Sequence, residues 1–311
     1  APVSREGSLV LNNLLFTTAA ATVLLGTLYP LVIDALDAGK VSVGAPYFDA
    51  VFIPLMTPTL VLAGLAPLLA WKRADLAGAL ARLWFAFAAA AVAALILAGD
   101  GPPLAILGAG MAAWLAAAVL VEWGERVRLF RVSIGETLRR AANLPRSAYG
   151  TSLAHFGVAM VVAGITASSA WKTESFQIMR PGETVTVAGD DYRFDGVEII
   201  EGPNYAAERG QFTVFDGERV IAVLQPEKRV YPVSQMPTTE AAILTTWLGD
   251  HYVVVGDADG KGGWATRIYY NPLVAWLWIG TIVMAVGGMV SLSDRRHRIG
   301  APRRTRAAVA A

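Results

Sequence analysis

Six long stretches without a charged residue restrict the architecture of this chain more than any other feature of its sequence. They cover residues 7–33, 50–71, 83–99, 101–121, 147–171 and 268–293, whereas the next longest, 230–239, has only ten residues. A helix that crosses a hydrocarbon core of about 30 Å needs roughly 20 apolar residues. Since none of the six shows the polar face of a helix in a soluble protein, they predict six transmembrane helices, with 83–99 the marginal one.

The overall composition argues against a soluble protein. Charged residues make up only 16% of the chain and hydrophobic residues 55%, where a soluble domain carries about a quarter charged residues. Cysteine is absent, which excludes disulfides, thiolate metal sites and thiol exchange by this chain. The chain starts at Ala1 without a methionine or a signal peptide, and we expect it to be part of a longer polypeptide.

Arginine and lysine predict the orientation of the six spans. They concentrate in the connections 72–82 and 122–146 and in the tail 294–311, whereas 34–49 and 100–102 offer only Lys40. The positive-inside rule therefore places both ends of the chain in the cytoplasm and residues 172–267 on the other side. That segment carries fifteen acidic and nine basic residues, a net charge of −6. The 122–146 connection is expected to form an amphipathic helix on the cytoplasmic surface, with Val127, Phe130, Ile134, Leu138 and Ala141 opposite its arginines.

The polar segment 172–267 has the two-residue period of β-strands. Strands are predicted around 184–187, 192–194, 212–215, 220–224, 252–255 and 266–269. The pairs Asp195-Gly196, Asp216-Gly217 and Asp259-Gly260 predict turns between them, and 240–248 predicts a short helix. The predicted fold class is an α-helical integral membrane protein with a compact antiparallel β-rich domain inserted between the fifth and sixth transmembrane helices. The expected divisions are 1–171, 172–267, 268–293 and the basic tail 294–311.

No motif of soluble catalysis is present, so the catalytic residues are unknown and the search narrows to three histidines. His297 lies among arginines of the tail, where a solvated side chain is expected. His251 begins a predicted strand, and a turn or surface role is expected there. His155 lies inside the fifth span, where an ionisable group is costly and indicates a functional site. Thr151, Ser152 and other small residues flank it, leaving room for a flat group, and imidazole is a common ligand of haem iron. The alternative is a histidine that is hydrogen-bonded to another helix.

Several segments resemble the carboxy-terminal half of the CcmF/NrfE haem lyase family of cytochrome c maturation. They are 4–7, 11–13, 26–30, 43–48, 149–157, 231–233, 239–243 and 271–276, which follow the family in order over nearly the whole chain. The resemblance implies a multi-pass protein of the bacterial inner membrane that attaches haem to apocytochrome c, with 172–267 in the periplasm. It also implies that His155, in the Ala-His-x-Gly segment, is one of two axial ligands of a transmembrane haem b.

The resemblance also implies what this chain does not carry. The second axial histidine, the two periplasmic histidines that hold the incoming haem and a tryptophan-rich segment belong to the preceding half of the family. This chain by itself is therefore expected to hold haem weakly. The implied chemistry is thioether formation between haem vinyl groups and the thiols of a Cys-x-x-Cys-His substrate, with haem as substrate. The transmembrane haem would keep the iron of the transferred haem reduced.

The implied partners are the preceding half, a haem chaperone, thiol-handling maturation subunits, apocytochrome c and the lipid bilayer, and no nucleic acid. In the outer domain, residues 238–243 are the first candidate for a docking patch, unless they only cap a short helix, with Thr239 as its N-cap. Two other classes of function remain open on the sequence. One is a subunit of a transporter for haem or another small molecule, and the other is a membrane scaffold for cytochrome assembly.

The predicted orientation can be tested by cysteine labelling, because the chain contains no cysteine of its own. A cysteine at Gly217, in the periplasmic segment, should react with an impermeant thiol reagent added from outside. A cysteine at Ser133, in the cytoplasmic connection, should react only after the membrane has been permeabilised. The opposite pattern of labelling would contradict the membrane orientation.

Overall fold

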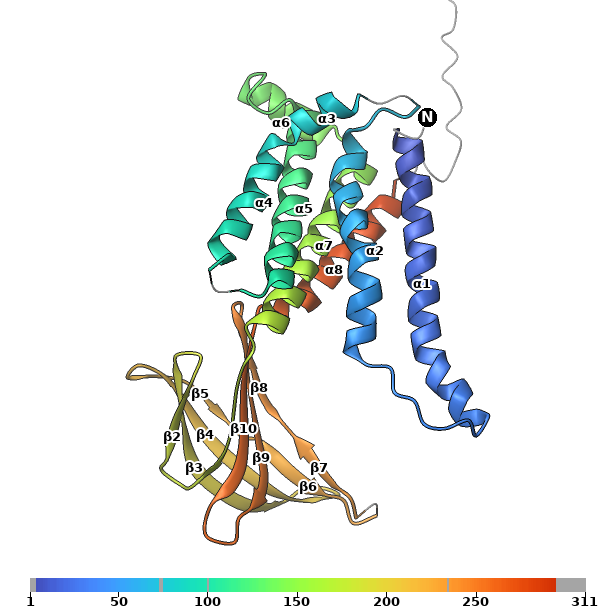
Figure 1. The fold of residues 1–311 in the computed structure, drawn as a ribbon. Coiled ribbons are helices and arrows are strands. Elements are labelled where there is room, and N and C mark those ends of the chain that lie inside the picture. Colours follow the sequence, from blue (N-terminus) through green and yellow to red (C-terminus); the bar gives the residue numbers. More distant parts are fainter. Residues whose placement is uncertain (1–3, 73–74, 100, 234, 295–311) are drawn as a thin grey trace, which may run out of the picture. The chain divides into compact units, whose positions relative to one another are not determined.

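A computed structural model of the chain describes residues 4–72, 75–99, 101–233 and 235–294 (Figure 1). The chain divides into two compact units, which are described separately below. The helical unit takes the residues up to Met160 and those from Gly280 onward, and the second unit is Val161–Ile279. The tail with His297 lies outside the described residues, so its expected solvated state stays a prediction.

Five helices in the described residues are long and apolar enough to cross a membrane. They are α1 (Arg5–Ala35), α2 (Ala45–Leu65) with the short η1 (Ala66–Leu68), α5 (Pro103–Val127), α7 (Arg146–Ala170) and α8 (Val274–Leu292). The expected span at 83–99 is a single helix that is too short to count among these five. It corresponds to α4 (Trp84–Leu97), which meets α3 (Leu76–Arg82) at an angle of 57°. With 14 residues, α4 is about 21 Å long, shorter than a hydrocarbon core.

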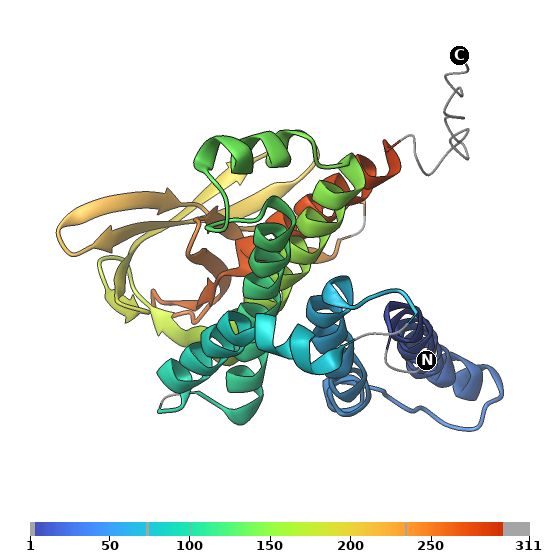
Figure 2. The ribbon, with the colours of Figure 1, turned by 90° about the horizontal axis from the view of Figure 1, so that it is seen from above.

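The helices of the helical unit pack through apolar and small side chains. In α5, the buried residues Trp114, Leu115 and Ala118 form a cluster with Leu83 and Ala86. Helices α1 and α2 lie side by side, as Figures 1 and 2 show. The hydroxyl of Tyr47 in α2 joins them by donating a hydrogen bond of 3.0 Å to the carbonyl of Thr22 in α1.

Helices α7 and α8 are antiparallel and approach each other along a row of glycines, which we call the glycine seam. A Cβ atom built on Gly157 would lie 2.5 Å from the carbonyl oxygen of Gly280, and one on Gly150 would lie 2.5 Å from that of Gly287. One on Gly164 would lie 3.0 Å from the carbonyl oxygen of Leu273. The seam repeats every seven residues on both helices, so the two backbones touch over about four turns.

Two expectations about helix boundaries were wrong. The expected sixth span began at residue 268, but α8 begins at Val274, because 264–272 continue the neighbouring sheet as a strand. The connector 122–146 is not one amphipathic helix. Helix α5 continues to the buried Val127, Arg128 takes a left-handed conformation, and only α6 (Ile134–Ala142) is amphipathic. The apolar side chains of Ile134 and Leu138 in α6 are exposed, as expected for a helix on a membrane surface.

The second unit holds a sandwich of two antiparallel sheets between α7 and α8 (Figure 1). One sheet has the order β1-β10-β9-β8, and the other β2-β3-β4-β6-β7 with β5 paired to β4. The strands are β1 (Thr173–Met179), β2 (Thr184–Val187), β3 (Asp190–Glu201), β4 (Ala206–Asp216), β5 (Arg219–Leu224), β6 (Glu227–Val230), β7 (Pro237–Glu240), β8 (Ala242–Thr245), β9 (Gly249–Ala258) and β10 (Trp264–Pro272). Side chains of both sheets form the core, including Tyr192, Phe194, Phe212, Val253 and Ile268.

The strands confirm the two-residue period but correct three details. The Asp195-Gly196 pair is not a turn. It forms a bulge within β3, where Gly196 has φ +136°, a conformation that side-chain-bearing residues rarely adopt. The expected helix at 240–248 is instead the end of β7, strand β8 and the turn before β9, because the residues of β8 pair with β9. Thr239 is accordingly a residue of strand β7 and not the N-cap of a helix.

The glycine seam predicts a strong effect of added side-chain volume. Gly157→Leu should lower the free energy of unfolding by about 1–3 kcal/mol or more, because its side chain meets the backbone of α8. Gly288→Leu is the matched control on α8, since a Cβ there meets no atom within 4 Å. Thermal unfolding of both variants in detergent measures the difference. Equal melting temperatures would contradict the close packing of α7 and α8.

Candidate functional site

His155 lies in α7 and faces a cleft within the helical unit. The cleft has about 230 Å³ of empty space and is open to its surroundings. It is lined from α2 and η1 by Ala63, Gly64 and Pro67, from α5 by Ala118, Val119 and Glu122, and from α7 by Thr151, Ser152 and His155. Helix geometry explains why His155 faces it: Gly150 and Gly157 turn toward α8, so His155 points to another side of α7.

The polar side chains beside His155 in the cleft form hydrogen bonds or ion pairs within their own helices. The hydroxyl of Thr151 donates to the carbonyl of Ser147 at 2.9 Å, and that of Ser152 to the carbonyl of Ala148 at 3.1 Å. The carboxylate of Glu122 pairs with Arg126 one turn further along α5. Within the described residues, no hydrogen bond or ion pair reaches His155, which is half-buried. The neutral imidazole therefore has a free lone pair, as a metal ligand requires.

His155 could bind the iron of a group that lies against the cleft. The cleft does not enclose such a group. Its empty space of about 230 Å³ includes the open space at its mouth, so the part that protein encloses is smaller still. A haem bound by His155 would therefore need further walls from outside this cleft. Within the described part of the chain, no three His, Cys, Asp or Glu side chains come together to hold a metal ion without such a group.

Trp114 packs against Gly64, one of the residues that line the cleft, and the sequence did not indicate this role. Its ring is 3% exposed, and its indole N–H has no hydrogen-bond acceptor in the described structure. The ring lies so close to Gly64 that a Cβ atom there would be 2.8 Å from the indole nitrogen. Gly64 and Glu122 were also missed. For Glu122, the signal was its i,i+4 spacing to Arg126 at the end of an apolar run.

The expectation that His251 lies at a turn or on the surface was wrong. It lies in β9 and is 4% exposed, because β9 is an inner strand of its sheet. Its Nδ1 forms a hydrogen bond of 2.6 Å with the hydroxyl of Tyr192 and lies 3.8 Å from a carboxylate oxygen of Asp190. Burial lowers the pKa of His251, while the charges of Asp190 and Asp250 oppose this shift. The histidine is thus a neutral part of the sandwich core.

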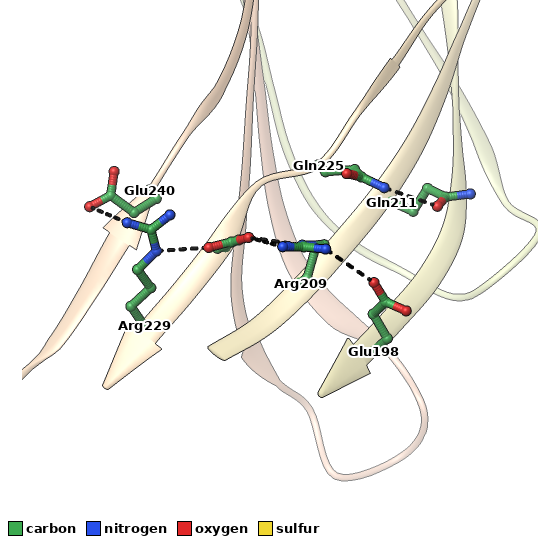
Figure 3. Close-up of polar contacts among 7 residues, drawn as sticks. Glu198, Arg209, Gln211, Gln225, Arg229 and Glu240 are labelled. Carbon is green, nitrogen blue, oxygen red and sulfur yellow. Dashed lines mark hydrogen bonds and ion pairs between the residues drawn. The ribbon is translucent and has the colours of Figure 1, made fainter. Parts of the chain in front are cut away.

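A row of alternating charges crosses four strands on the other sheet (Figure 3). Arg209 contacts Glu227 at 2.7 Å and Glu198 at 3.6 Å, and Arg229 contacts Glu227 at 2.7 Å and Glu240 at 3.7 Å. The side chain of Glu227 is only 8% exposed. Burial by itself would raise the pKa of Glu227, but the hydrogen bonds from Arg229 and Arg209 outweigh burial and lower it. Glu240, from the expected docking patch 238–243, is the end of this row.

Apolar helices of membrane-spanning length and an inserted β-sandwich define the class: an α-helical membrane protein with a β domain between two of its helices. Residues 170–272 match the family model described as the CcmF C-terminal beta-sandwich. The cytochrome c-type biogenesis protein CycK of Rhizobium meliloti (strain 1021) is 48% identical over 100% of this chain and 46% of its own length. The protein CcmF of Pseudomonas aeruginosa (strain ATCC 15692) is 39% identical over 98% of this chain and 46% of its own.

A solved structure, cytochrome c heme lyase CcmF, is also similar, with a TM-score of 0.70 and 28% identity. The similarity covers 94% of this chain and 46% of that one. The chain belongs to the CcmF/NrfE family, which confirms the resemblance inferred from its sequence motifs. It spans just under half the length of the relatives that it matches.

The buried His251 predicts that acid destabilises the β-sandwich. Because its pKa in the folded protein lies below the ordinary value of 6.5, the unfolded chain binds more protons between these two values. The contribution to stability is complete above pH 6.5 and is lost as the pH falls through 6.5 toward the folded-state pKa. Hydrogen exchange of the β9 amides, followed from pH 7.5 to 5, measures the loss.

His251→Gln is the control for this pH dependence. Burial raises the pKa values of Asp190 and Asp250, so these groups have the opposite pH dependence and remain in the variant. The difference between the two proteins therefore reports the titration of His251 together with its effect on the two carboxylates, whose pKa values its charge lowers. If the β9 amides of both proteins respond equally to acid, His251 is not the titrating group.

Proposed function

We propose that this chain is part of a cytochrome c haem lyase, which attaches haem to apocytochrome c at the periplasmic face of the bacterial inner membrane. Within it, His155 would be one axial ligand of a transmembrane haem b. The single observation that carries this assignment is the unpartnered imidazole of His155, which faces an open cleft with small walls inside a bundle of apolar helices. A histidine that served only packing would be expected to hydrogen-bond to a neighbouring helix.

The residues around His155 leave its imidazole free to bind iron. The hydroxyls of Thr151 and Ser152 are bonded to carbonyls of their own helix and do not compete for the imidazole nitrogens. The glycine seam holds α7 against α8 on either side of His155, which fixes the direction of the side chain. When bound, the haem would supply electrons that keep the iron of the transferred haem reduced. The second axial ligand would come from the preceding half of the protein.

The β-sandwich would serve as a docking surface for the maturation partners. A haem chaperone, thiol-handling subunits and apocytochrome c all act on the periplasmic side, where the positive-inside rule places residues 172–267. The net charge of −6 and the absence of cysteine suit a domain that presents haem while other subunits handle the substrate's thiols. The bent pair α3–α4 would complete the six spans, with both ends of the chain in the cytoplasm.

The proposal predicts that His155→Ala removes the b-type haem spectrum from the complete protein. An iron with two protein ligands loses one of them, and the open cleft offers no other side chain of the required type among its lining residues. Optical spectra of the purified, dithionite-reduced protein measure the loss, and haem quantification gives its extent.

Thr151→Ala is the matched control, because Thr151 lines the same cleft one turn away. It should retain the spectrum, as should His297→Ala and His251→Gln, which change histidines outside the cleft. Full b-type absorbance and activity in His155→Ala would mean that this histidine is only a packed polar residue.

A further inference from the structure

The turn between β8 and β9 exposes two large apolar side chains. Residues 246–248, the hairpin tip, include Trp247 and Leu248, which are 58% and 66% exposed. Two amides are bonded within the turn: that of Thr246 donates to the carbonyl of Gly249 at 3.0 Å, and that of Gly249 donates to the Thr246 hydroxyl at 3.1 Å. Residues 241–249 carry no charge. A hairpin tip with these properties is unusual for a turn surrounded by water.

Two hydrogen bonds attach the hairpin tip to the beginning of helix α8. The amide of Leu273 donates to the carbonyl of Leu248 at 2.8 Å, and the indole N–H of Trp276 donates to the carbonyl of Trp247 at 3.1 Å. The rings of Trp247 and Trp276 also pack at 5.6 Å. The hairpin tip is therefore held at the level of the first turn of a helix that is apolar enough to span a membrane.

Helix α7 shows how deep this level lies. Gly164 of α7 faces Leu273 and Leu277, so the first turn of α8 lies beside Gly164. Helix α7 continues beyond this level to Ala170, which adds about 9 Å along its axis. The hairpin tip thus lies further into the predicted membrane span than the last residue of α7 does. In the same part of α8, Trp278 is 72% exposed, as expected for the aromatic belt at a membrane interface.

We propose that the hairpin tip inserts into the boundary between lipid headgroups and acyl chains and is a membrane anchor of the β-sandwich. The occupant that fits is lipid, because the exposed Trp247 packs against Trp276 of α8, a helix apolar enough to span a membrane. Tryptophan suits this depth, since its ring is apolar and its N–H is polar. The hydrogen bonds within the turn and to α8 satisfy part of its backbone, which lowers the cost of insertion into lipid. The sandwich is then held to the bilayer at three places: α7, α8 and the hairpin tip.

A fluorescent label on a single cysteine tests the depth of the hairpin tip in the complete protein. With any other cysteines replaced, the Leu248→Cys variant is labelled with bimane and reconstituted in phosphatidylcholine nanodiscs, with or without nitroxide-labelled lipid. Lys261→Cys is the matched control. It lies in the turn at the far end of β9, roughly 30 Å away along the strand, and is also exposed to solvent.

The label at 248 should be strongly quenched by nitroxides near the headgroup and be about tenfold less accessible to aqueous iodide than the label at 261, since the interface excludes polar solutes. Thermal unfolding, which should match that of the unlabelled protein, verifies that both labelled variants are folded. Iodide access at 248 equal to that at 261 would overturn the proposal, because the hairpin tip would then lie in water. Exclusion of iodide without quenching by the lipid nitroxides would also overturn it, because the tip would then be covered by protein.

Discussion

The close contact between α7 and α8 is the interaction on which the other features of this chain depend. Glycines spaced by seven residues on α7 allow the backbone of α8 to approach without an intervening side chain. In a membrane, where no hydrophobic effect drives helices together, such backbone contact and dispersion are what stabilise a helix pair. The seam occupies one face of α7, and His155 therefore lies on a different face, toward α2 and α5. The same pair of helices continues into β1 and β10, the two strands that begin and end the sandwich.

The membrane helices and the β-rich nature of the insert were predictable because each depends on a strong, local signal. Charge-free runs gave α1, α5 and α7 to within a few residues at their starts, and alternation gave six of the strands. The missed features depend on contacts between distant segments. The start of α8 at Val274 could not be predicted, because the charge-free run begins earlier, at Ile268. Ile268 and Tyr269 belong to this run, but they lie in a strand that pairs with β1 and β9. Likewise, β8 resembles a helix in sequence until its pairing with β9 is known.

One residue of the candidate site, His155, was predictable from the sequence, but the residues around it were not. His155 stood out because an ionisable side chain within an apolar run requires an explanation. The cleft around it combines residues from three helices, and no local pattern links Gly64, Trp114 and Glu122 to it. His251 was misjudged for the opposite reason. Its neighbours Gly249 and Asp250 indicated a turn, whereas the inner position of β9 buries it against Tyr192. For both histidines, burial was decided by the tertiary fold and not by adjacent residues.

The pairing of β1 with β10 has a consequence for the entropy of the chain. Thr173 lies opposite Tyr270, only a few residues after α7 ends and before α8 begins. About a hundred residues therefore leave and return at almost the same point. Closing a flexible loop of that length would oppose the pairing of α7 and α8, since the entropic cost grows with the logarithm of loop length. Once the sandwich is folded, its ends are already together and most of this cost is removed. The insert then acts like a short turn, so folding of the sandwich and association of the helices favour each other.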